Sequence, residues 1–167
     1  SIEGACVYAV GMSSGAGMVN RLAHEMAERL AAVALVAGAY PPWNGCRPAR
    51  PVPLLAFHGT ADRVVPYGGL GRALPPIRQW AVAWAAHNRC GAQPAVIQRR
   101  GAVLREVWLA RGGASVTLYT IVGGGHDWPG SPDVPADAPA SGLDATAIIW
   151  EFFCRHGLQP GGANGRA

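Results

Sequence analysis

The sequence contains no lysine, and all 14 of its basic residues are arginines. We interpret this bias as a consequence of a genome rich in G and C, without functional meaning. Charged residues make up only 14% of the 167 residues, whereas hydrophobic residues make up 50%. So few charges and so many apolar side chains exclude a disordered chain and predict one globular domain with a substantial core.

Nothing in the sequence indicates a nucleic-acid-binding surface or a membrane span. The formal net charge is +4, but the arginines are scattered, and only Arg99 and Arg100 are adjacent to each other. Solvated surface arginines are therefore a better interpretation than a site for nucleic acid. No apolar run approaches the roughly 18 residues that a membrane-spanning helix requires.

The four cysteines, Cys6, Cys46, Cys90 and Cys154, do not have the spacing of a zinc site. If all were oxidised they would allow three pairings, among which the sequence does not choose. Cys6 lies in a predicted core strand and Cys154 in a predicted helix, where a lone thiol usually behaves as a small hydrophobic group. We therefore expect at most one disulfide, and we predict no metal or other cofactor.

A short strand, a tight glycine turn and a helix are predicted in succession near the start of the chain. Residues 6–10 form a β-branched and aromatic run that is typical of a buried strand. Residues 11–15 (GMSSG) match G-x-S-x-G, the motif of a nucleophile elbow. An ordinary glycine-rich turn could contain the same letters, but the order strand, turn, helix is the context that the motif requires. We therefore predict that Ser13 is a nucleophile.

The rest of the chain predicts a mostly parallel sheet with helices on both faces, which is an α/β fold. Apolar and β-branched runs predict further strands over 32–37, 52–57, 102–109 and 115–122. Helical spacing predicts helices over 18–30, 77–88 and 144–155, the last with Asp144 as its N-cap. In the first helix, Met18 and Met26 are expected on the buried face and Asn20 on the polar face.

Three polar residues are expected at the carboxyl ends of predicted strands, where function collects in such sheets. They are Ser13, Asp62 and His126, and their order along the chain is that of the α/β-hydrolases. His126 would accept the proton of Ser13, because the ordinary pKa of an imidazole lies near working pH. Asp62 would fix the tautomer of the imidazole and stabilise its protonated form.

Each partner of Ser13 has a simpler alternative. Asp62 could instead have no catalytic role and simply close an Asx-type turn. His58 stands before a glycine at a strand end, but as the base its ring would compete with Asp62 for space, and we interpret it as a structural turn residue. Asp127, beside His126, is not expected to be the acid of the triad.

A tetrahedral intermediate in acyl transfer needs two N–H donors. One is predicted at Ser14, whose backbone N–H follows the nucleophile at the start of a helix. The second should come from a loop before the nucleophile strand, and only twelve residues precede Ser13. We therefore expect the second donor to be absent from this chain, and the chain to be cut from a longer protein.

Three blocks of sequence together carry a family resemblance. They are residues 11–15 (GMSSG), residues 58–67 (HGTADRVVPY) and residues 123–130 (GGGHDWPG). With them the chain resembles, from Val7 to His156, the polyhydroxybutyrate depolymerase and feruloyl esterase group of α/β-hydrolases, which is similar to carbohydrate esterase family 1. The third block is the most specific of the three.

The resemblance implies a secreted or envelope-attached serine esterase that acts through an acyl-enzyme on Ser13. Its substrates would be hydroxyalkanoate polyesters or oligomers, or feruloyl and acetyl esters of plant polysaccharides. It also implies a set of substrate contacts, with Trp128 near the acyl pocket: Met12, Tyr40, Trp43, Tyr67 and Trp128. For the loop aromatics Tyr40 and Trp43, packing is an equally good interpretation.

Residues 1–157 are thus predicted to form the C-terminal part of an α/β-hydrolase catalytic domain, and residues 158–167 a disordered tail. Because the early strands of the family are missing, the nucleophile strand is expected at an unpaired edge of the sheet. A prolyl-oligopeptidase-like serine peptidase has the same order of triad residues, but residues 125–130 argue against it. The alternative in which the chain is not an enzyme is a catalytically silent fragment or binding module of the same fold.

Overall fold

The computed structural model describes residues 7–41, 47–112, 114–139 and 141–157. The predictions for Cys6, Trp43, Cys46 and the 158–167 tail lie outside these ranges. Within them, strands form one six-stranded sheet in the order β1-β2-β3-β6-β5-β4. The strands are β1 (Tyr8–Met12), β2 (Ala32–Val36), β3 (Leu54–Gly59), β4 (Val96–Arg100), β5 (Val103–Trp108) and β6 (Val116–Ile121).

The sheet is parallel over β1, β2, β3 and β6 and antiparallel over β6, β5 and β4. The predicted parallel strands are confirmed, and the predicted strand over 102–109 is the antiparallel β5. β4 was not predicted, because residues 97–100 of this strand are all exposed and show no apolar alternation. In the described residues β1 and β4 are the side edges of the sheet, so the strand before Ser13 lies at an edge, as predicted.

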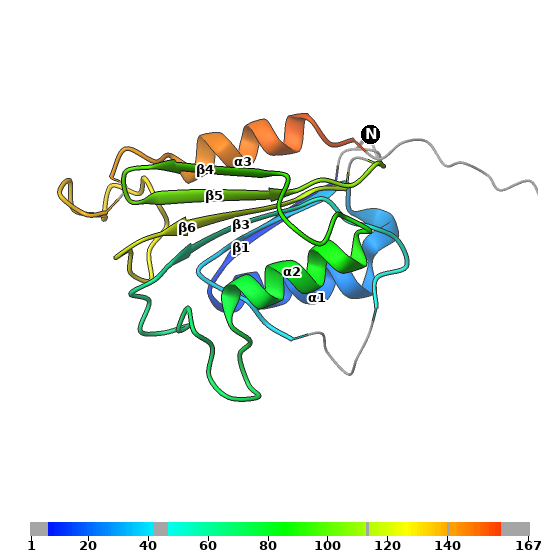
Figure 1. Cartoon of the computed structure of the whole chain (residues 1–167), viewed down its shortest axis with the longest axis horizontal. Coiled ribbons are helices and arrows are strands. Elements are labelled where there is room, and N and C mark those ends of the chain that lie inside the picture. Colours follow the sequence, from blue (N-terminus) through cyan, green and yellow to red (C-terminus); the bar gives the residue numbers. More distant parts are fainter. Residues whose placement is uncertain (1–6, 42–46, 113, 140, 158–167) are drawn as a thin grey trace, which may run out of the picture.

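Helices cover both faces of the sheet, as predicted (Figure 1). α1 (Ser14–Glu25) and α2 (Ile77–His87) lie on one face, and α3 (Ala145–Cys154) lies on the other. A short 3-10 turn, η2 (Ala27–Arg29), follows α1. Asp144 caps α3, since its side chain accepts the N–H of Ala147 at 3.0 Å. In the described ranges, no helix has the length and apolar character that crossing a bilayer requires.

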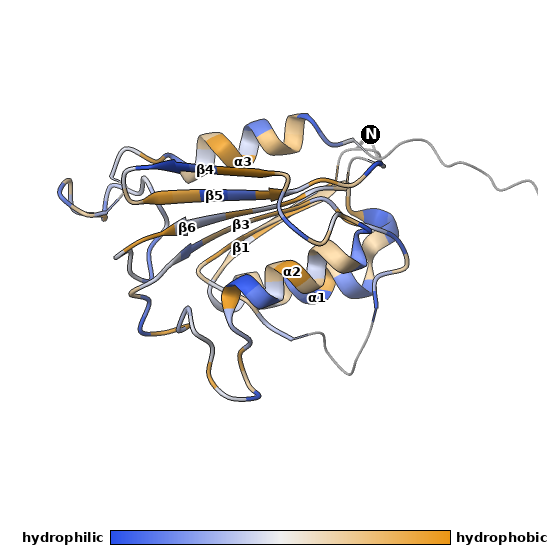
Figure 2. Ribbon diagram, viewed as in Figure 1, coloured by the Kyte–Doolittle hydropathy of each residue, from blue (hydrophilic) through white to orange (hydrophobic). Residues whose placement is uncertain are grey.

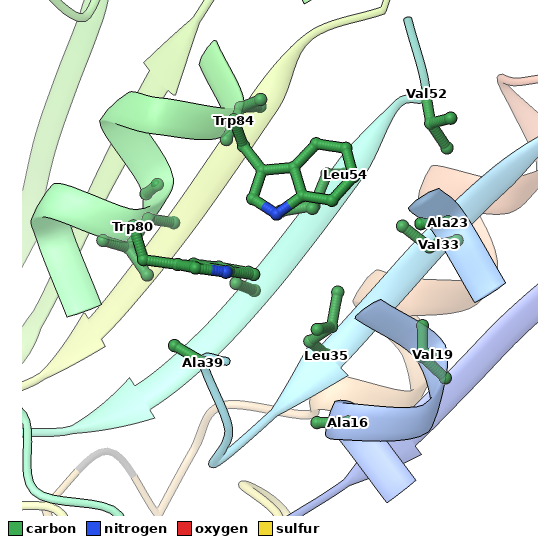
Figure 3. Close-up of a cluster of buried hydrophobic side chains, with 14 of the residues drawn as sticks. Ala16, Val19, Ala23, Val33, Leu35, Ala39, Val52, Leu54, Trp80 and Trp84 are labelled. Atoms are coloured by element: carbon green, nitrogen blue, oxygen red, sulfur yellow. The ribbon is translucent and has the colours of Figure 1, made fainter. Parts of the chain in front are cut away.

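The larger of two buried clusters lies between the sheet and the helices α1 and α2 (Figure 3). Trp80 and Trp84 of α2 reach toward β3, whereas α1 contributes small side chains such as Ala16 and Ala23. Small side chains let α1 approach the sheet closely at native packing density. Figure 2 shows apolar residues along the central strands and a mixture of apolar and hydrophilic residues along the helices.

The predicted buried face of α1 is wrong in part. Met18 is 57% exposed and Met26 39% exposed, whereas Asn20 is only 2% exposed. The Asn20 amide donates to the carbonyl oxygen of Tyr40 at 3.1 Å and accepts the indole N–H of Trp84 at 3.1 Å. A polar side chain with both groups paired can be buried without the penalty of lost hydration. Asn20 therefore lies on the buried face of α1, where the two methionines were expected.

Candidate active site

The candidate catalytic residues follow three parallel strands. They lie at the edge of the sheet formed by the carboxyl ends of these strands, which is distinct from the side edges formed by β1 and β4. Ser13 follows β1 directly, Asp62 stands three residues after β3, and His126 stands five residues after β6. Because these strands run parallel, their carboxyl ends meet at one edge, which is where ligands bind in open α/β sheets. The predicted placement of all three residues at this edge is therefore what the strand order produces.

Ser13 occupies the strained turn between β1 and α1. Its backbone angles are φ 54° and ψ −121°, in a region that few residues other than glycine adopt. The Ser13 N–H donates to Val36 of β2 at 2.9 Å, and its carbonyl accepts the N–H of Gly17 at 3.1 Å. The strand, turn and helix order required by the elbow motif is thus present, and it holds Ser13 between the sheet and the start of α1.

The two glycines of the motif differ in how much room surrounds them. A Cβ at Gly11 would overlap the backbone carbonyl of Gly15, whereas a Cβ at Gly15 would meet nothing within 4 Å among the described residues. Gly11→Ala is therefore expected to destabilise the protein by about 3 kcal/mol, because the clash is with backbone.

Gly15→Ala is the matched control for Gly11→Ala. It is expected to leave stability unchanged or to raise it by up to about 1 kcal/mol, since alanine favours a helix. Urea denaturation of both variants measures the difference. Equal losses of unfolding free energy would contradict this account of the elbow.

Asp62 is buried and uses its two carboxylate oxygens for two different purposes. Oδ1 accepts the backbone N–H groups of Val64 and Val65, each at 2.8 Å, and so closes a turn. Oδ2 accepts a hydrogen bond from Nδ1 of His126 at 2.8 Å. Asp62 therefore closes its own turn and is also hydrogen-bonded to His126, and its role as the acid of a triad stays a prediction.

The pKa of Asp62 reflects this arrangement. Burial by itself raises the pKa, but the hydrogen bonds from His126 and from the Val65 and Val64 amides outweigh burial and hold it below its ordinary value of 3.8. Asp62 is thus an anion at neutral pH, so Nδ1 of His126 carries the proton between them. In the neutral imidazole, the other ring nitrogen, Nε2, then has a lone pair, as a general base requires.

The glycines before His126 let its loop cross over the end of β3. A Cβ at Gly59 would overlap the backbone of Gly124, so the two loops touch there through backbone alone. The Ala61 N–H donates to the Gly124 carbonyl at 2.9 Å, and Thr60 Oγ1 accepts the Gly123 N–H at 2.8 Å. This crossing shifts His126 from β6 toward β1, the strand that leads to Ser13.

Among the described residues, no hydrogen bond joins Ser13 Oγ to the ring of His126. The His126 side chain is 19% exposed, so its ring borders solvent at the edge where a substrate would enter. Catalytic hydrogen bonds are often long before substrate binds and shorten in the reacting complex. The structure thus brings Asp62 and His126 into contact, and it places Ser13 at the same edge.

His58 was interpreted as a structural turn residue, and its contacts agree with that interpretation. His58 lies in β3 and is 2% exposed, and its Nε2 donates to the Val65 carbonyl at 2.8 Å. The same nitrogen lies 3.3 Å from Oδ2 of Asp62, so both rings flank one carboxylate oxygen. The spacing His-Gly-x-x-Asp at the end of a buried strand was the signal for this contact, because residues four apart can face each other across a tight turn.

The unfolding free energy is expected to fall as the pH drops from about 7 to about 5, in part because of His58. Burial lowers the pKa of His58 below its ordinary value of 6.5, and the Val65 bond and the Asp62 charge offset burial only in part. As the pH falls below 6.5, the unfolded chain takes up a proton that the folded chain does not, which favours unfolding. His24, whose pKa burial also lowers, contributes with the same sign.

His58→Gln has no imidazole to protonate and keeps an N–H donor, so the fall in stability should be shallower in this variant. Urea midpoints measured at several pH values in parallel check this expectation. A pH dependence identical to that of the unsubstituted protein would contradict it.

The candidate substrate contacts have different surroundings. The Tyr40 ring lies against Gly17 of α1 and Gly38 after β2, because a Cβ at either glycine would lie 3.1 Å from it. Burial, and secondarily the Asp62 charge, raise the pKa of Tyr40, so its hydroxyl remains protonated at neutral pH. Met12 is partly buried on the face of the sheet that α3 covers. The role of Tyr40 as a substrate contact stays a prediction.

Tyr67 and Trp128 both have hydrogen bonds that hold loops in place. The Tyr67 hydroxyl bonds Thr120 Oγ1 of β6 at 2.8 Å, and Trp128 Nε1 donates to Thr146 Oγ1 of α3 at 3.0 Å. Their roles as substrate contacts stay predictions, and Trp43 lies outside the described residues.

Ser14 is the first residue of α1, so its N–H lies at the helix N-terminus, where the helix dipole favours negative charge. Of the described residues that precede Ser13, those from Tyr8 to Met12 form β1 and provide no loop. That the second oxyanion donor is absent from the chain stays a prediction. Among the described residues, no group of three or more His, Cys, Asp or Glu side chains is arranged to hold a metal ion, and Cys90 and Cys154 are free thiols.

A mostly parallel sheet covered on both faces, a strained serine between its first strand and helix, and an Asp–His pair at the same edge define a part of an α/β-hydrolase fold. The fold class predicted from the sequence is confirmed. A solved structure supports it: the acetyl xylan esterase from Aspergillus awamori matches with a TM-score of 0.55 at 18% identity, over 91% of this chain and 60% of that one.

Two curated proteins are similar in sequence. NocK of Nocardia uniformis subsp. tsuyamanensis, by its name a predicted esterase, is 36% identical over 146 residues, which cover 74% of this chain and 42% of NocK. Feruloyl esterase B of Piromyces equi is 36% identical over 132 residues, which cover 72% of this chain and 24% of that enzyme. No family model matches. The resemblance to esterases is thereby confirmed, and the chain spans less than half the length of either curated relative.

Proposed function

We propose that this chain provides the serine site of a carboxylic ester hydrolase. The observation that carries the proposal is the Asp62 carboxylate, which closes its own turn with one oxygen and accepts His126 with the other at 2.8 Å. This pair stands at the sheet edge where Ser13 sits in a strained turn. The esterase names of the two curated relatives and of the structural neighbour support the same chemistry.

The reaction proceeds in two halves through an acyl-enzyme. Ser13 Oγ attacks the ester carbonyl while Nε2 of His126 takes its proton, and Asp62 stabilises the imidazolium that forms. The Ser14 N–H and the start of α1 stabilise the oxyanion. His126 then gives its proton to the departing alcohol, which leaves the acyl group on Ser13. In the second half His126 activates water, and hydrolysis releases the acid and restores Ser13.

Feruloyl and acetyl esters of polysaccharides are the proposed substrates, with hydroxyalkanoate esters as the alternative acyl class. The names of feruloyl esterase B and the acetyl xylan esterase favour the polysaccharide esters. Tyr40 would then form one wall of the acyl pocket, with Met12, Tyr67, Trp128 and Trp43 as further candidates. We also propose that the protein is secreted or attached to the cell envelope, where such polymers are found.

The experiment compares p-nitrophenyl acetate and butyrate, methyl ferulate and a hydroxybutyrate oligomer with peptide anilides. Ester hydrolysis with little or no anilide cleavage is expected. Cleavage of anilides alone would instead identify a prolyl-oligopeptidase-like peptidase. A fluorophosphonate probe tests the silent-module alternative: a folded sample that forms no Ser13 adduct would overturn the esterase proposal for this chain.

A further inference from the structure

We propose that His58 is a positioning residue, which acts through Asp62 by fixing the turn that presents this carboxylate to His126. The inference deepens the proposed function, since it concerns the same site and rests on the esterase proposal for its kinetic part. It also makes a structural claim that can be measured without any substrate.

The first step concerns the proton on His58. Its Nε2 lies 2.8 Å from the Val65 carbonyl oxygen, and a carbonyl can only accept a hydrogen bond. Nε2 therefore carries the proton, and the bond joins the rigid strand β3 to the turn that follows it. The Val65 N–H in turn donates to Oδ1 of Asp62 at 2.8 Å. Val65 thus links the two side chains: its carbonyl oxygen accepts the hydrogen bond from His58, and its N–H donates to Asp62.

The second step concerns the other carboxylate oxygen. Oδ2 of Asp62 lies 3.3 Å from Nε2 of His58 and 2.8 Å from Nδ1 of His126. The shorter contact is the catalytic one, and the longer one limits rotation of the carboxylate away from His126. With both oxygens in contact with donors, the carboxylate has one orientation, which catalysis by a triad requires.

The third step explains why the two rings have different roles. The His58 side chain is 2% exposed and that of His126 19% exposed, so only His126 borders solvent. The titratable groups that face His58 are Asp62, His126 and Tyr67, whose ring centre lies 6.0 Å away. Burial has the largest effect on the pKa of His58 and lowers it, so this ring is neutral at neutral pH. The Asp62 charge is then available to stabilise a proton on His126.

Three variants and one control test the inference in the full protein. His58→Leu removes the N–H donor, His58→Asn keeps polarity with a donor too short to reach Val65, and His58→Gln places a donor near the position of Nε2. His87→Gln is the control, because His87 lies at the end of α2, outside the site. Each variant is studied below its melting temperature, and active sites are counted by fluorophosphonate titration to completion.

His58→Leu and His58→Asn are expected to lower kcat per titrated site by about 100-fold with KM unchanged, as for a misplaced catalytic group. His58→Gln should retain kcat to within about fivefold, because it restores the donor. A purely structural role would instead lower the number of titrated sites and the melting temperature while kcat per site stays constant. That result in both His58→Leu and His58→Asn, or equal losses in His58→Gln and His58→Leu, would overturn the inference.

A second readout separates this inference from the esterase proposal. The proton in the bond between His126 Nδ1 and Asp62 Oδ2 should give a far-downfield proton NMR resonance that is absent in Asp62→Asn. We expect this resonance to persist in His58→Gln and to be lost in His58→Leu and His58→Asn. If the protein hydrolyses no ester but shows this pattern, the function fails and the positioning role holds. If esters are hydrolysed and the resonance survives in His58→Leu, the positioning role fails.

Discussion

Ser13→Ala is expected to lower kcat for ester hydrolysis by about 10⁶-fold, because the proposed acyl-enzyme forms on the hydroxyl that this substitution removes. The fold should survive, since the elbow is held by backbone contacts of Ser13 with Val36 and Gly17 that alanine retains. Alanine also adopts the φ of 54° at a cost similar to that of serine. The measurement is kcat on p-nitrophenyl butyrate, with the melting temperature measured in parallel.

Ser141→Ala is the matched control for Ser13→Ala, because Ser141 is exposed in the loop before α3. It should retain full activity. If Ser13→Ala kept more than a small fraction of kcat in a folded protein, another nucleophile would have to act, and the assignment of Ser13 would be wrong.

Asp62→Asn is expected to lower kcat by about 10⁴-fold while leaving the turn intact. The amide oxygen can still accept the N–H groups of Val64 and Val65, which hold the carboxylate now at 2.8 Å each. The amide NH₂ would then face Nδ1 of His126 in place of an acceptor. The ring must turn its lone pair toward that NH₂ and carry its proton on Nε2, so it can no longer accept the proton of Ser13.

Asp127→Asn is the control for Asp62→Asn, because Asp127 is the neighbour of His126 in sequence and is exposed. It should change kcat by less than about threefold. A large loss in Asp127→Asn together with a small one in Asp62→Asn would exchange the roles of the two carboxylates and contradict the site described above.

Asp62→Asn is also expected to change the stability of the protein in acid. The folded-state pKa of Asp62 lies below its ordinary value of 3.8, so the carboxylate stabilises the fold above that range. This contribution is lost as the pH falls through the folded-state pKa. Asp62→Asn cannot be protonated in this range, so its stability should fall less steeply below about pH 4 than that of the unsubstituted protein.

Much of the site could be predicted from the sequence because its signals are local. The elbow is five consecutive residues between a strand and a helix, and the strands before Asp62 and His126 are continuous apolar runs. Their order places Ser13, Asp62 and His126 at one edge whatever the details of packing. The division of α1 and α2 from α3 on opposite faces follows from the same alternation of strands and helices.

What could not be predicted depends on partners that are distant in sequence. Asn20 is buried because Tyr40 and Trp84 supply its hydrogen bonds, and a helical periodicity contains no information on either. β4 is an edge strand whose exposed residues have no apolar pattern. His58 was interpreted as a structural turn residue, but its contact with Asp62 at 3.3 Å depends on the path of the turn after β3 and was not predicted.

The most direct test of the account is to identify the residue that carries the acyl group during ester hydrolysis. The protein is mixed with p-nitrophenyl butyrate, quenched in acid during turnover and digested, and the peptides are analysed by mass spectrometry. We predict a butyryl group on Ser13, absent in Ser13→Ala and lost from the intact protein when substrate is exhausted. Ester turnover with no acyl group on Ser13, or with the acyl group on another residue, would contradict the account.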